Sequence, residues 1–460
     1  MKIEQIYTSC LSQGAYYIQS AGEAAIIDPL RETAPYLQRA ARDGTTINYI
    51  FETHFHADFV SGHVDLAEKT GARIVYGPGA ETSYEKYEAT DGERFRLGNI
   101  SFEVLHTPGH TPESSCYLLY DENDRPHALF SGDTLFIGDV GRPDLAQNGS
   151  LTKEDLAGML YDSLRTKIMP LPDDVIVYPA HGAGSACGKN MSNETTDTLG
   201  NQKATNYALR ADMTREAFIR EVTAGILPPP QYFSKNALLN KRGPGEFAEV
   251  MRSGAVPLDP DAFEAVVNRE GALVLDTRHQ DIFAEGFIPN SIFIGIKGSF
   301  APWVGTLITD LQQPIVFVAE AGKEAEVVTR LARVGYDNTL GYLAGGIDAW
   351  RAAGKELDRI DGIGAEELLN KLNTDPALQV IDARKPTEYE AGHVNKVKSL
   401  PLDYLSARMD ELDRDQTYYV HCQSGYRSMI FSSILKARGY DKVVDVKGGY
   451  KALTAKAIAN

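Results

Sequence analysis

Hydrophobic residues in the first half of the chain fall into short runs separated by turns or by helical patterns. The runs that predict strands are residues 15–19, 23–29, 47–54, 72–77, 100–109, 114–120, 127–133 and 174–182. Such runs, rich in β-branched and aromatic residues and bounded by turn residues, are typical of β-strands. Because the strands alternate with helical segments, residues 1 to about 225 predict a layered α/β domain.

A change in composition marks the end of this region. Residues 226–260 contain several prolines and glycines, which interrupt regular secondary structure. We therefore expect a domain margin followed by a linker, and residues 1–250 are assigned to the first domain with its linker.

The rest of the chain repeats itself. The segment "GALVLDTRHQDIFAEGFIPNSIFI" (271–294) matches "ALQVIDARKPTEYEAGHVNKVKSL" (377–400), and the segments that follow also match one another. Self-similarity at this spacing indicates a repeated structural unit. Residues 258–357 and 358–460 are therefore predicted to be two copies of one α/β domain, each with a small parallel sheet and helices on both faces.

The composition narrows the range of functions. The chain is 43% hydrophobic and 24% charged, with a formal net charge of -17, and so acidic a surface argues against a general binder of nucleic acid or of membrane surfaces. No apolar run reaches the roughly 20 residues of a spanning helix, and the N-terminal residues lack signal-peptide features, so we expect a cytoplasmic protein. Its four cysteines, Cys10, Cys116, Cys187 and Cys422, are too few and too scattered for a disulfide framework, which predicts free thiols.

Residue types that bind metals follow several of the predicted strands, where loops carry function on a rigid scaffold. Six of them occur in four motifs: His54, His56 and Asp58 in "THFHADFVSGH", His110 in "HTPGHTPES", Asp133 in "FSGDTLF", and His181 in "YPAHGAGS".

In this order the motifs resemble the metallo-β-lactamase superfamily, and within it the branch of glyoxalase II and the ETHE-like persulfide dioxygenases. The resemblance implies an αββα sandwich for the first domain. Two-metal members use the residue after the aspartate as a ligand of the second ion, and here that residue is Phe59. Because a phenyl ring cannot coordinate a metal, we expect a centre with one metal ion.

Two imidazoles and one carboxylate, with open positions opposite, form a ligand set that suits non-haem Fe(II) and O2 chemistry. By the resemblance, His54, His110 and Asp133 would hold one Fe(II) per chain, with O2 as co-substrate. The resemblance makes His56, Asp58 and His181 residues that orient the ligands or face the substrate. Direct binding of the metal by His56 stays open.

Two further residues are candidates for the same site. Arg142 in "GDVGRPDL" corresponds to an arginine at the thiol-substrate pocket of the dioxygenases, and a guanidinium offers a planar fork of donors to a carboxylate or phosphate. The alternative is a surface arginine paired with Asp144. Cys187, six residues after His181, is either a relay thiol near the iron or a buried, inert cysteine.

The segment "YYVHCQSGYRSMIF" (418–431) predicts a strand, a loop and a helix that starts near Ser428. Backbone N–H groups of such a loop and the helix N-terminus stabilise a thiolate or a bound anion. Cys422 is the predicted nucleophile, and Arg427 is predicted to hold an anionic substrate. The residues between them form the sulfur-transfer loop: Gln423, Ser424, Gly425 (which permits the tight turn) and Tyr426.

This loop resembles the active site of the rhodanese family of sulfurtransferases. Both C-terminal copies resemble rhodanese domains, and the second has Asp382, Arg384, Glu388 and His393 in family positions. The alternative is a phosphatase of the related Cdc25 type, whose loop has one more residue between cysteine and arginine. Four residues separate Cys422 from Arg427, the shorter loop that suits a sulfur atom.

The first copy lacks both functional residues of the loop. Ala319 aligns with the cysteine and Glu324 with the arginine, so neither a nucleophile nor an anion clamp is present. We expect this copy to be inactive and to act as a structural spacer or an interface.

The whole chain resembles persulfide dioxygenases fused to two rhodanese domains, an arrangement of bacterial sulfide-detoxification enzymes of the CstB type. The implied activity is oxidation of a low-molecular-weight thiol persulfide by O2 to sulfite and thiol, with sulfur transfer at Cys422 that makes or uses thiosulfate. Expected partners are a persulfide of the glutathione, coenzyme A or bacillithiol type, sulfite or thiosulfate, and further copies of the chain in a dimer or tetramer. Two alternatives stay open: a zinc-dependent, glyoxalase II-like thioester hydrolase with a sulfurtransferase domain, and a non-catalytic sulfur carrier or redox sensor that uses Cys422 alone.

Overall fold

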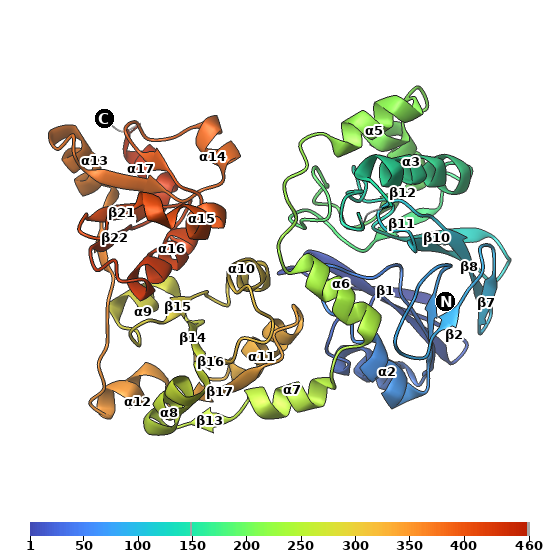
Figure 1. Cartoon of the computed structure of the whole chain (residues 1–460). Coiled ribbons are helices and arrows are strands. Elements are labelled where there is room, and N and C mark those ends of the chain that lie inside the picture. The colour runs from blue at the N-terminus through green and yellow to red at the C-terminus, as the bar shows by residue number, and fades with distance from the viewer. Residues whose placement is uncertain (148–149, 458–460) are drawn as a thin grey trace. The chain divides into compact units, whose positions relative to one another are not determined.

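A computed structural model describes residues 1–147 and 150–457 of the chain (Figure 1). The chain divides into two compact units. The first comprises Met1–Ala248 with Ala332–Gly335, and the second comprises Glu249–Leu331 with Tyr336–Asn460. The last three residues of the predicted second repeat, 458–460, lie outside the described residues.

Two six-stranded sheets form the centre of the first unit. In sheet order, the first contains β1 (Lys2–Thr8), β2 (Gln13–Ser20), β3 (Glu23–Ile27), β4 (Thr46–Phe51), β5 (Arg73–Tyr76) and β6 (Tyr87–Glu88). The second contains β12 (Asp197–Thr198), β11 (Ile176–Pro179), β10 (Pro126–Gly132), β9 (Ser115–Tyr120), β8 (Ile100–His106) and β7 (Arg94–Leu97). All eight hydrophobic runs predicted as strands lie on these elements.

The two sheets pack face to face around an aromatic core. Phe51 on the first sheet and Phe102, Tyr117 and Phe130 on the second are fully buried in one cluster. Helices α1 (Ala34–Asp43) and α2 (His63–Thr70) cover the outer face of the first sheet. Helices α3 (Lys153–Ser163) and α5 (Arg215–Thr223) cover that of the second (Figure 1). The predicted αββα sandwich is confirmed.

The topology brings the ends of several strands to one edge of this sandwich. Strand β4 runs parallel to β3 and β5, and β10 runs parallel to β11. The loops that follow β4, β8, β10 and β11 carry the candidate metal ligands, so the sandwich positions them from several independent strands.

The expectation of a linker over 226–260 is largely wrong. Helices α6 (Phe233–Arg242) and α7 (Phe247–Gly254) occupy most of this stretch. The run between the prolines at 228–230 and Gly243 is uninterrupted by either residue type, and it is long enough to form α6. Asn240 on α6 is buried and bonded to the "THFHADF" loop, so this helix belongs to the first domain.

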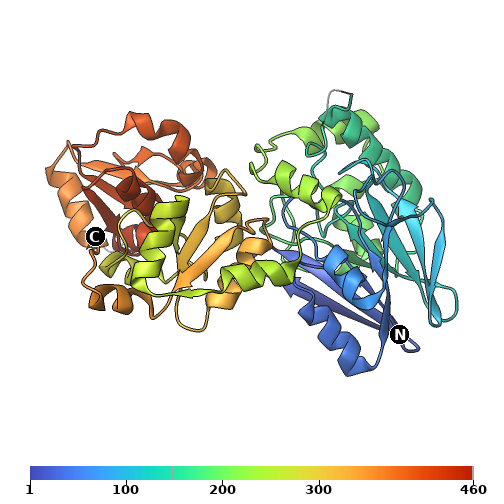
Figure 2. The ribbon, with the colours of Figure 1, turned by 60° about the horizontal axis from the view of Figure 1, so that its bottom comes forward.

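The second unit contains two five-stranded sheets with the same strand order (Figures 1 and 2). The first, in sheet order, has β13 (Pro257–Leu258), β17 (Thr339–Leu343), β16 (Ile315–Val318), β14 (Leu273–Asp276) and β15 (Ile292–Phe293). The second has β18 (Asp361–Ile363), β22 (Val443–Val446), β21 (Tyr418–His421), β19 (Gln379–Asp382) and β20 (Lys398–Ser399). Every pairing within them is parallel, which confirms the two predicted parallel α/β domains.

The remaining helices follow the same repeat. The first copy has α8 (Pro260–Glu270), α9 (Gln280–Glu285), α10 (Phe300–Leu307), α11 (Glu324–Ala332) and α12 (Gly346–Ala352). The second has α13 (Ala365–Thr374), α14 (Pro386–Ala391), η3 (Leu402–Tyr404), α15 (Leu405–Arg408), η4 (Met409–Glu411), α16 (Tyr426–Ala437) and α17 (Gly449–Ala457). The first unit also holds η1 (Leu164–Ile168), α4 (Leu199–Thr205) and η2 (Tyr207–Leu209). Among the described residues, no helix combines the length and apolar character needed to cross a membrane.

Candidate functional site

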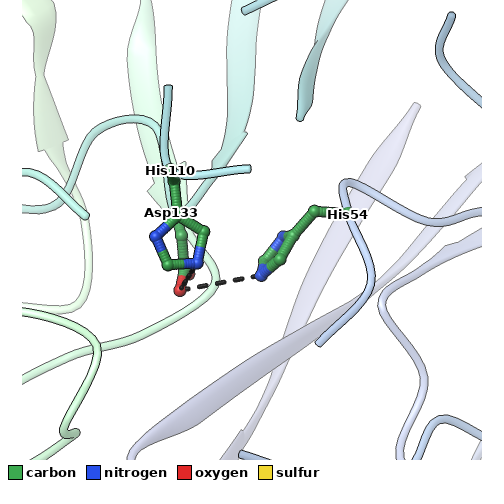
Figure 3. A group of neighbouring side chains, drawn as sticks. All are labelled: His54, His110 and Asp133. Atoms are coloured by element: carbon green, nitrogen blue, oxygen red, sulfur yellow. Dashed lines mark ion pairs between the residues drawn. The ribbon is translucent and has the colours of Figure 1, made fainter. Parts of the chain in front are cut away.

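The three predicted metal ligands converge in the first unit. His54 follows β4, His110 follows β8 and Asp133 follows β10, and all three are buried. Nε2 of His54 lies 3.7 Å, and Nε2 of His110 3.4 Å, from Oδ2 of Asp133 (Figure 3). One ligand atom from each residue lies within 4.8 Å of the others, so the three atoms surround a common point.

Hydrogen bonds behind His54 fix the orientation of its ring. Thr53 Oγ1 donates to Asp28 Oδ2 at 2.8 Å, so its oxygen is left to accept from Nδ1 of His54, 2.9 Å away. A hydroxyl has only one proton to give, so Nδ1 of His54 carries the ring proton. Its Nε2 then turns a lone pair toward Asp133, as a metal ligand must.

The same logic applies to His110 through the backbone of Arg142. Nδ1 of His110 lies 2.8 Å from the carbonyl oxygen of Arg142, which can only accept, so Nε2 keeps its lone pair. The Arg142 guanidinium is buried and donates to both oxygens of Asp144 and to the carbonyls of Ala186 and Leu227. The pairing with Asp144 weighed as the alternative is therefore present, although this arginine is not on the surface.

The carboxylate of Asp133 is prepared to bind a cation. Burial alone would raise its pKa, but the neighbouring charged imidazole of His181 lowers the pKa of Asp133 well below its usual range. Burial and the adjacent His56 lower the pKa of His54, which keeps that ligand neutral. Among the described residues, Oδ2 of Asp133 has no hydrogen-bond partner although it is buried. These buried groups are consistent with a metal ion at this point.

The imidazole of His181 lies beside these ligands and contacts two carboxylates. Its Nδ1 lies 2.7 Å from Oδ1 of Asp133, and its Nε2 lies 2.8 Å from Oδ2 of Asp58. Burial would lower the pKa of His181, but the two carboxylates raise it well above its usual value. With both nitrogens protonated and paired, His181 can bind a second metal ion only after it loses a proton.

Phe59 and His56 lie next to each other in the loop that also carries His54. The Phe59 ring is fully buried and stacks on the imidazole of His56. Nε2 of His56 lies 3.1 Å from Oδ1 of Asp28 and 3.9 Å from Oε2 of Glu52. His56 therefore belongs to a group with these two carboxylates, separate from the three converging ligands.

Cys187 lies next to this centre. Its sulfur is close enough to Asp58 and His181 to share a ligand point with them, and the residue is buried. Burial and the charges of Asp58 and Asp133 raise the pKa of Cys187 well above its usual value. The thiol of Cys187 is therefore protonated. Its role as a relay stays a prediction. Burial also raises the pKa of Cys116 to about 11, as expected for a packing residue.

Sequence reasoning missed the residues that hold the metal loop from behind. Nδ2 of Asn240 donates to the carbonyls of His56 and Phe59 at 2.7 and 2.8 Å, and its Oδ1 accepts from the Ser61 N–H at 2.9 Å. Asn240 lies on α6, far along the chain, and no local pattern marks it. The sequence does carry a signal for Asp28. This residue directly follows a hydrophobic strand, where a carboxylate has no packing role.

The second candidate centre lies after β21 in the second unit. Cys422 is only 1% exposed, and its Sγ accepts a hydrogen bond from the Gly425 N–H at 3.2 Å. Gln423 and Ser424 are exposed on the loop. An amide directed at the sulfur stabilises a thiolate or persulfide, so the loop geometry suits a nucleophilic cysteine.

The helix after this loop begins earlier than predicted. Its first residue is Tyr426 rather than one near Ser428. Gly425 caps the helix with a φ of 109°, a left-handed conformation that glycine adopts at no steric cost. The glycine thus lets the chain turn into the helix two residues earlier, and the helix N-terminus directly follows the cysteine loop.

Arg427 is not free in this structure. Its guanidinium donates two hydrogen bonds to the carboxylate of Glu388, at 2.5 and 2.8 Å. An incoming anion must therefore compete with Glu388 for the predicted clamp.

The other family positions form a second ion pair at the base of the loop. Arg384 donates to Asp382 through Nε and Nη2 and stacks over the ring of Tyr450, 3.6 Å from its centroid. His393 stacks on Tyr389. These contacts support the loop region rather than the sulfur atom itself.

In the first copy, Ala319 directly follows β16, the strand that holds the position of β21 in the sheet. Glu324 is the first residue of α11. The positions of the nucleophile and the clamp are thus preserved in the fold, but the functional side chains are absent.

A sandwich with a buried His/Asp centre, followed by two rhodanese-type sheets, defines the class of protein. Residues 9–181 match the model of the Metallo-beta-lactamase superfamily, and residues 259–353 and 364–456 match that of the Rhodanese-like domain. The chain belongs to the metallo-β-lactamase superfamily and carries two rhodanese-like domains.

Three relatives show what the chain resembles. A solved metallo-beta-lactamase from Staphylococcus aureus subsp. aureus COL is 32% identical, with a TM-score of 0.65, over 75% of this chain and 98% of that one. The human protein named Persulfide dioxygenase ETHE1, mitochondrial, is 30% identical over 45% of this chain and 74% of its own length. A Schizosaccharomyces pombe protein described as a probable hydroxyacylglutathione hydrolase is 32% identical over 35% of this chain, which spans 59% of that protein.

Proposed function

We propose that the chain is an Fe(II)-dependent persulfide dioxygenase coupled to a sulfurtransferase. The first domain would oxidise a low-molecular-weight thiol persulfide with O2, and the second rhodanese-like domain would make or use thiosulfate at Cys422. Both the persulfide dioxygenase and the hydroxyacylglutathione hydrolase relatives are about 30% identical in the first domain, so identity does not choose between oxidation and thioester hydrolysis.

One observation carries the choice of oxidation. The place beside the ligand group is occupied by the paired imidazolium of His181 and the apolar ring of Phe59. What remains is a set of two imidazoles and one carboxylate, which suits a single Fe(II) better than a two-metal hydrolase.

Side chains of this domain would prepare the site in three ways. His54, His110 and Asp133 would hold the metal, which when bound supplies the O2 chemistry that amino-acid side chains lack. The chain from Asp28 through Thr53 would keep the His54 ring in its ligand tautomer. Phe59 would exclude water and a second ion from one side.

The overall reaction balances with water as a reactant. A persulfide R–S–SH, O2 and H2O give the thiol R–SH, sulfite and two protons, and the terminal sulfur is oxidised while O2 is reduced. The S–S bond breaks, and the bridging sulfur leaves as the thiol.

At Cys422 the proposed step is a transfer between nucleophiles. Sulfite attacks the outer sulfur of a Cys422 persulfide, the S–S bond breaks, and thiosulfate leaves with the Cys422 thiolate restored. The reverse reaction would load Cys422 from thiosulfate. The Gly425 N–H at the sulfur would stabilise the thiolate in both directions.

The proposed partners follow from this chemistry. The carrier thiol would be of the glutathione, coenzyme A or bacillithiol type, with sulfite or thiosulfate as the second substrate. We also propose that the chain acts as a dimer or tetramer. Cys187 lies beside His181 and would serve as a relay thiol that accepts sulfur. Cys187→Ser would test this role.

Oxygen consumption tests the first half of the proposal. Full-length protein loaded anaerobically with Fe(II) is mixed with glutathione persulfide or coenzyme A persulfide in an oxygen electrode, and sulfite is quantified. Rapid O2 uptake with sulfite release is expected. No uptake, together with hydrolysis of a glutathione thioester by the zinc-loaded protein, would instead identify a hydrolase.

Cys422→Ser tests whether the two activities are separable. Formation or use of thiosulfate should disappear while O2 uptake stays within about twofold of the wild-type rate, because a serine hydroxyl cannot carry sulfane sulfur. Cys116→Ser, a change in a buried packing thiol, is the matched control and should leave thiosulfate turnover intact. Equal loss of both activities in Cys422→Ser would argue against two sites.

A further inference from the structure

The inactive copy makes specific contacts with the cysteine loop of the active copy. Within the second unit, the hydroxyl of Tyr426 donates a hydrogen bond to the carbonyl of Gly295 at 2.7 Å. Its ring also packs edge-on against Phe293, with ring centroids 5.9 Å apart. Tyr426 lies between Gly425 and Arg427, and it is the first residue of α16. The inactive copy therefore contacts the loop one residue away from its proposed anion clamp.

Two glycines make room for this ring. A Cβ atom added at Gly298 would overlap three ring atoms of Tyr426. One added at Gly295 would lie 3.2 Å from the ring, and closer still to Phe293, at 2.9 Å, and to the carbonyl oxygen of Arg278, at 3.0 Å. Neither glycine has a positive φ, so the backbone does not require glycine at either place. The close approach of Tyr426 is the reason that a larger residue does not fit at Gly298.

The segment that carries these glycines is itself held firmly. The N–H groups of Ile294 and Ile296 donate to the carbonyls of Asp276 and Thr277, and Arg330 donates to the Ile296 carbonyl at 2.8 Å. The segment is thus tied to the sheet and to α11 of the inactive copy, so it is a fixed surface rather than a loose loop.

A second contact fixes the helix behind the loop. Ser433 on α16 accepts a hydrogen bond from the N–H of Phe293 at 2.9 Å through its buried hydroxyl. Together with Tyr426, this contact fixes the first two turns of α16 against β15. Since the Gly425 N–H donates to Sγ of Cys422 at the start of that helix, the position of α16 sets the position of the donor at the sulfur.

We propose that the inactive copy acts as a positioning platform for the cysteine loop, with Tyr426 as the positioning residue and Gly295 and Gly298 as its seat. The seat holds the N-terminus of α16 in the place where the loop can stabilise the Cys422 thiolate. The duplicate domain then serves the reaction through a contact, although it has no nucleophile of its own. This inference rests on the proposed sulfur transfer at Cys422.

Gly298→Ala in the full-length protein tests the seat. The added methyl group displaces the Tyr426 ring, and a misplacement of about 1 Å near a reacting group can cost roughly a hundredfold in rate. We expect kcat for thiosulfate formation to fall at least about tenfold, with KM changed less than about threefold, while O2 uptake is unchanged. Gly286→Ala is the matched control in the same copy, because an added Cβ there meets no atom closer than 3.7 Å.

A double-mutant cycle separates positioning from simple destabilisation. In a Tyr426→Ala background the ring is gone, so Gly298→Ala should lower kcat by less than about twofold more. Independent, multiplicative losses, or wild-type kcat in Gly298→Ala, would overturn the proposal. If Gly298→Ala does not fold, Tyr426→Phe and Tyr426→Ala decide the question: both should lower kcat, the first about threefold through the lost hydrogen bond, and unchanged kcat in both would overturn it.

A readout that needs no sulfur transfer keeps this test apart from the proposed function. The rate at which iodoacetamide alkylates Cys422, followed by peptide mass, should fall in Gly298→Ala and not in Gly286→Ala, because the loop then stabilises the thiolate less well. If the wild-type protein transfers no sulfur but the alkylation rates follow this pattern, the proposed function fails and the seat stands. An unchanged or higher alkylation rate in Gly298→Ala overturns the seat.

Discussion

The phenyl ring of Phe59 stacks on the imidazole of His56, with ring centroids 4.3 Å apart and planes inclined by 30°. The pair directs His56 toward Asp28 and Glu52 rather than toward the three converging ligands. A residue that breaks the two-metal pattern of the superfamily therefore also determines which group its neighbour joins.

Phe59→His should restore the capacity for a second metal ion. The introduced imidazole would stand near Asp58 and His181, which already lie within reach of a common point. We expect metal content measured by mass spectrometry to rise from about one toward two ions per chain. O2 uptake should fall at least about tenfold, because the second ion would fill the positions that a single Fe(II) leaves open.

Phe59→Leu is the control for that substitution. It keeps an apolar side chain and adds no ligand, so metal content should stay at about one ion per chain. An unchanged metal content in Phe59→His, with both variants folded, would contradict the role assigned to Phe59.

Asn240→Ala should weaken metal binding from a helix outside the sandwich. Its side chain makes three hydrogen bonds to the metal-binding loop, and each buried group left unpaired costs about 1–3 kcal/mol. We expect the metal dissociation constant, measured by chelator competition, to rise roughly tenfold to a hundredfold.

Asn236→Ala on the same helix is the matched control for this prediction. Asn236 is also fully buried, but its side-chain amide has no hydrogen-bond partner among the described residues. It should leave the metal dissociation constant within about threefold of wild type. Equal effects of the two substitutions would mean that α6 acts through packing alone.

Glu388→Gln should improve binding of thiosulfate at the cysteine loop. The carboxylate of Glu388 occupies Arg427, and hydrogen bonds between two charged groups are stronger than those to a neutral amide. We expect KM for thiosulfate to fall about fivefold to tenfold. Glu390→Gln makes the same charge change at an exposed position on the same helix and should leave KM unchanged; a rise in KM for Glu388→Gln would show that Glu388 assists the clamp.

Asp445→Asn should change how stability depends on pH. Burial raises the pKa of Asp445 to about 7, even though Ser428 donates a hydrogen bond to it and Lys447 opposes the shift. Between about pH 4 and pH 7 the folded protein therefore holds a proton that the unfolded chain has released, so the stability of the wild type falls as the pH rises through this range.

In Asp445→Asn this loss should be absent. The variant should match the wild type near pH 4 and exceed it by roughly 1–4 kcal/mol above pH 7, which calorimetry of the second unit's transition would measure. Asp441→Asn, at an exposed aspartate nearby, should follow the wild-type profile. A constant difference between Asp445→Asn and the wild type at all pH values would contradict the assignment.

Much of the fold could be predicted because its signals are local. Each strand of the sandwich predicted from a hydrophobic run is present, and the repeat at 271–294 and 377–400 predicted two sheets of one topology. Helix α6 was misassigned because the prolines and glycines around it dominate the local composition, whereas its packing depends on Asn240, which is decided by tertiary structure.

The ligand residues could be predicted from their motifs, but their partners could not. Nothing in the sequence near His110 shows that its ring is oriented by the carbonyl of Arg142. The engagement of Arg427 by Glu388 is likewise a matter of geometry between separate elements. Spacing in a sequence identifies which side chains can do chemistry, and only the fold decides which of them are already paired.

We propose that His54, His110 and Asp133 would hold one iron ion, at which O2 would oxidise a persulfide. The most direct measurement determines the metal content of a sample and its O2 uptake with glutathione persulfide in parallel. We predict about one iron per chain, with sulfite formed in proportion to the O2 consumed, and loss of both the iron and the uptake in His110→Ala. Two zinc ions per chain, or no O2 uptake by iron-loaded protein, would contradict the account.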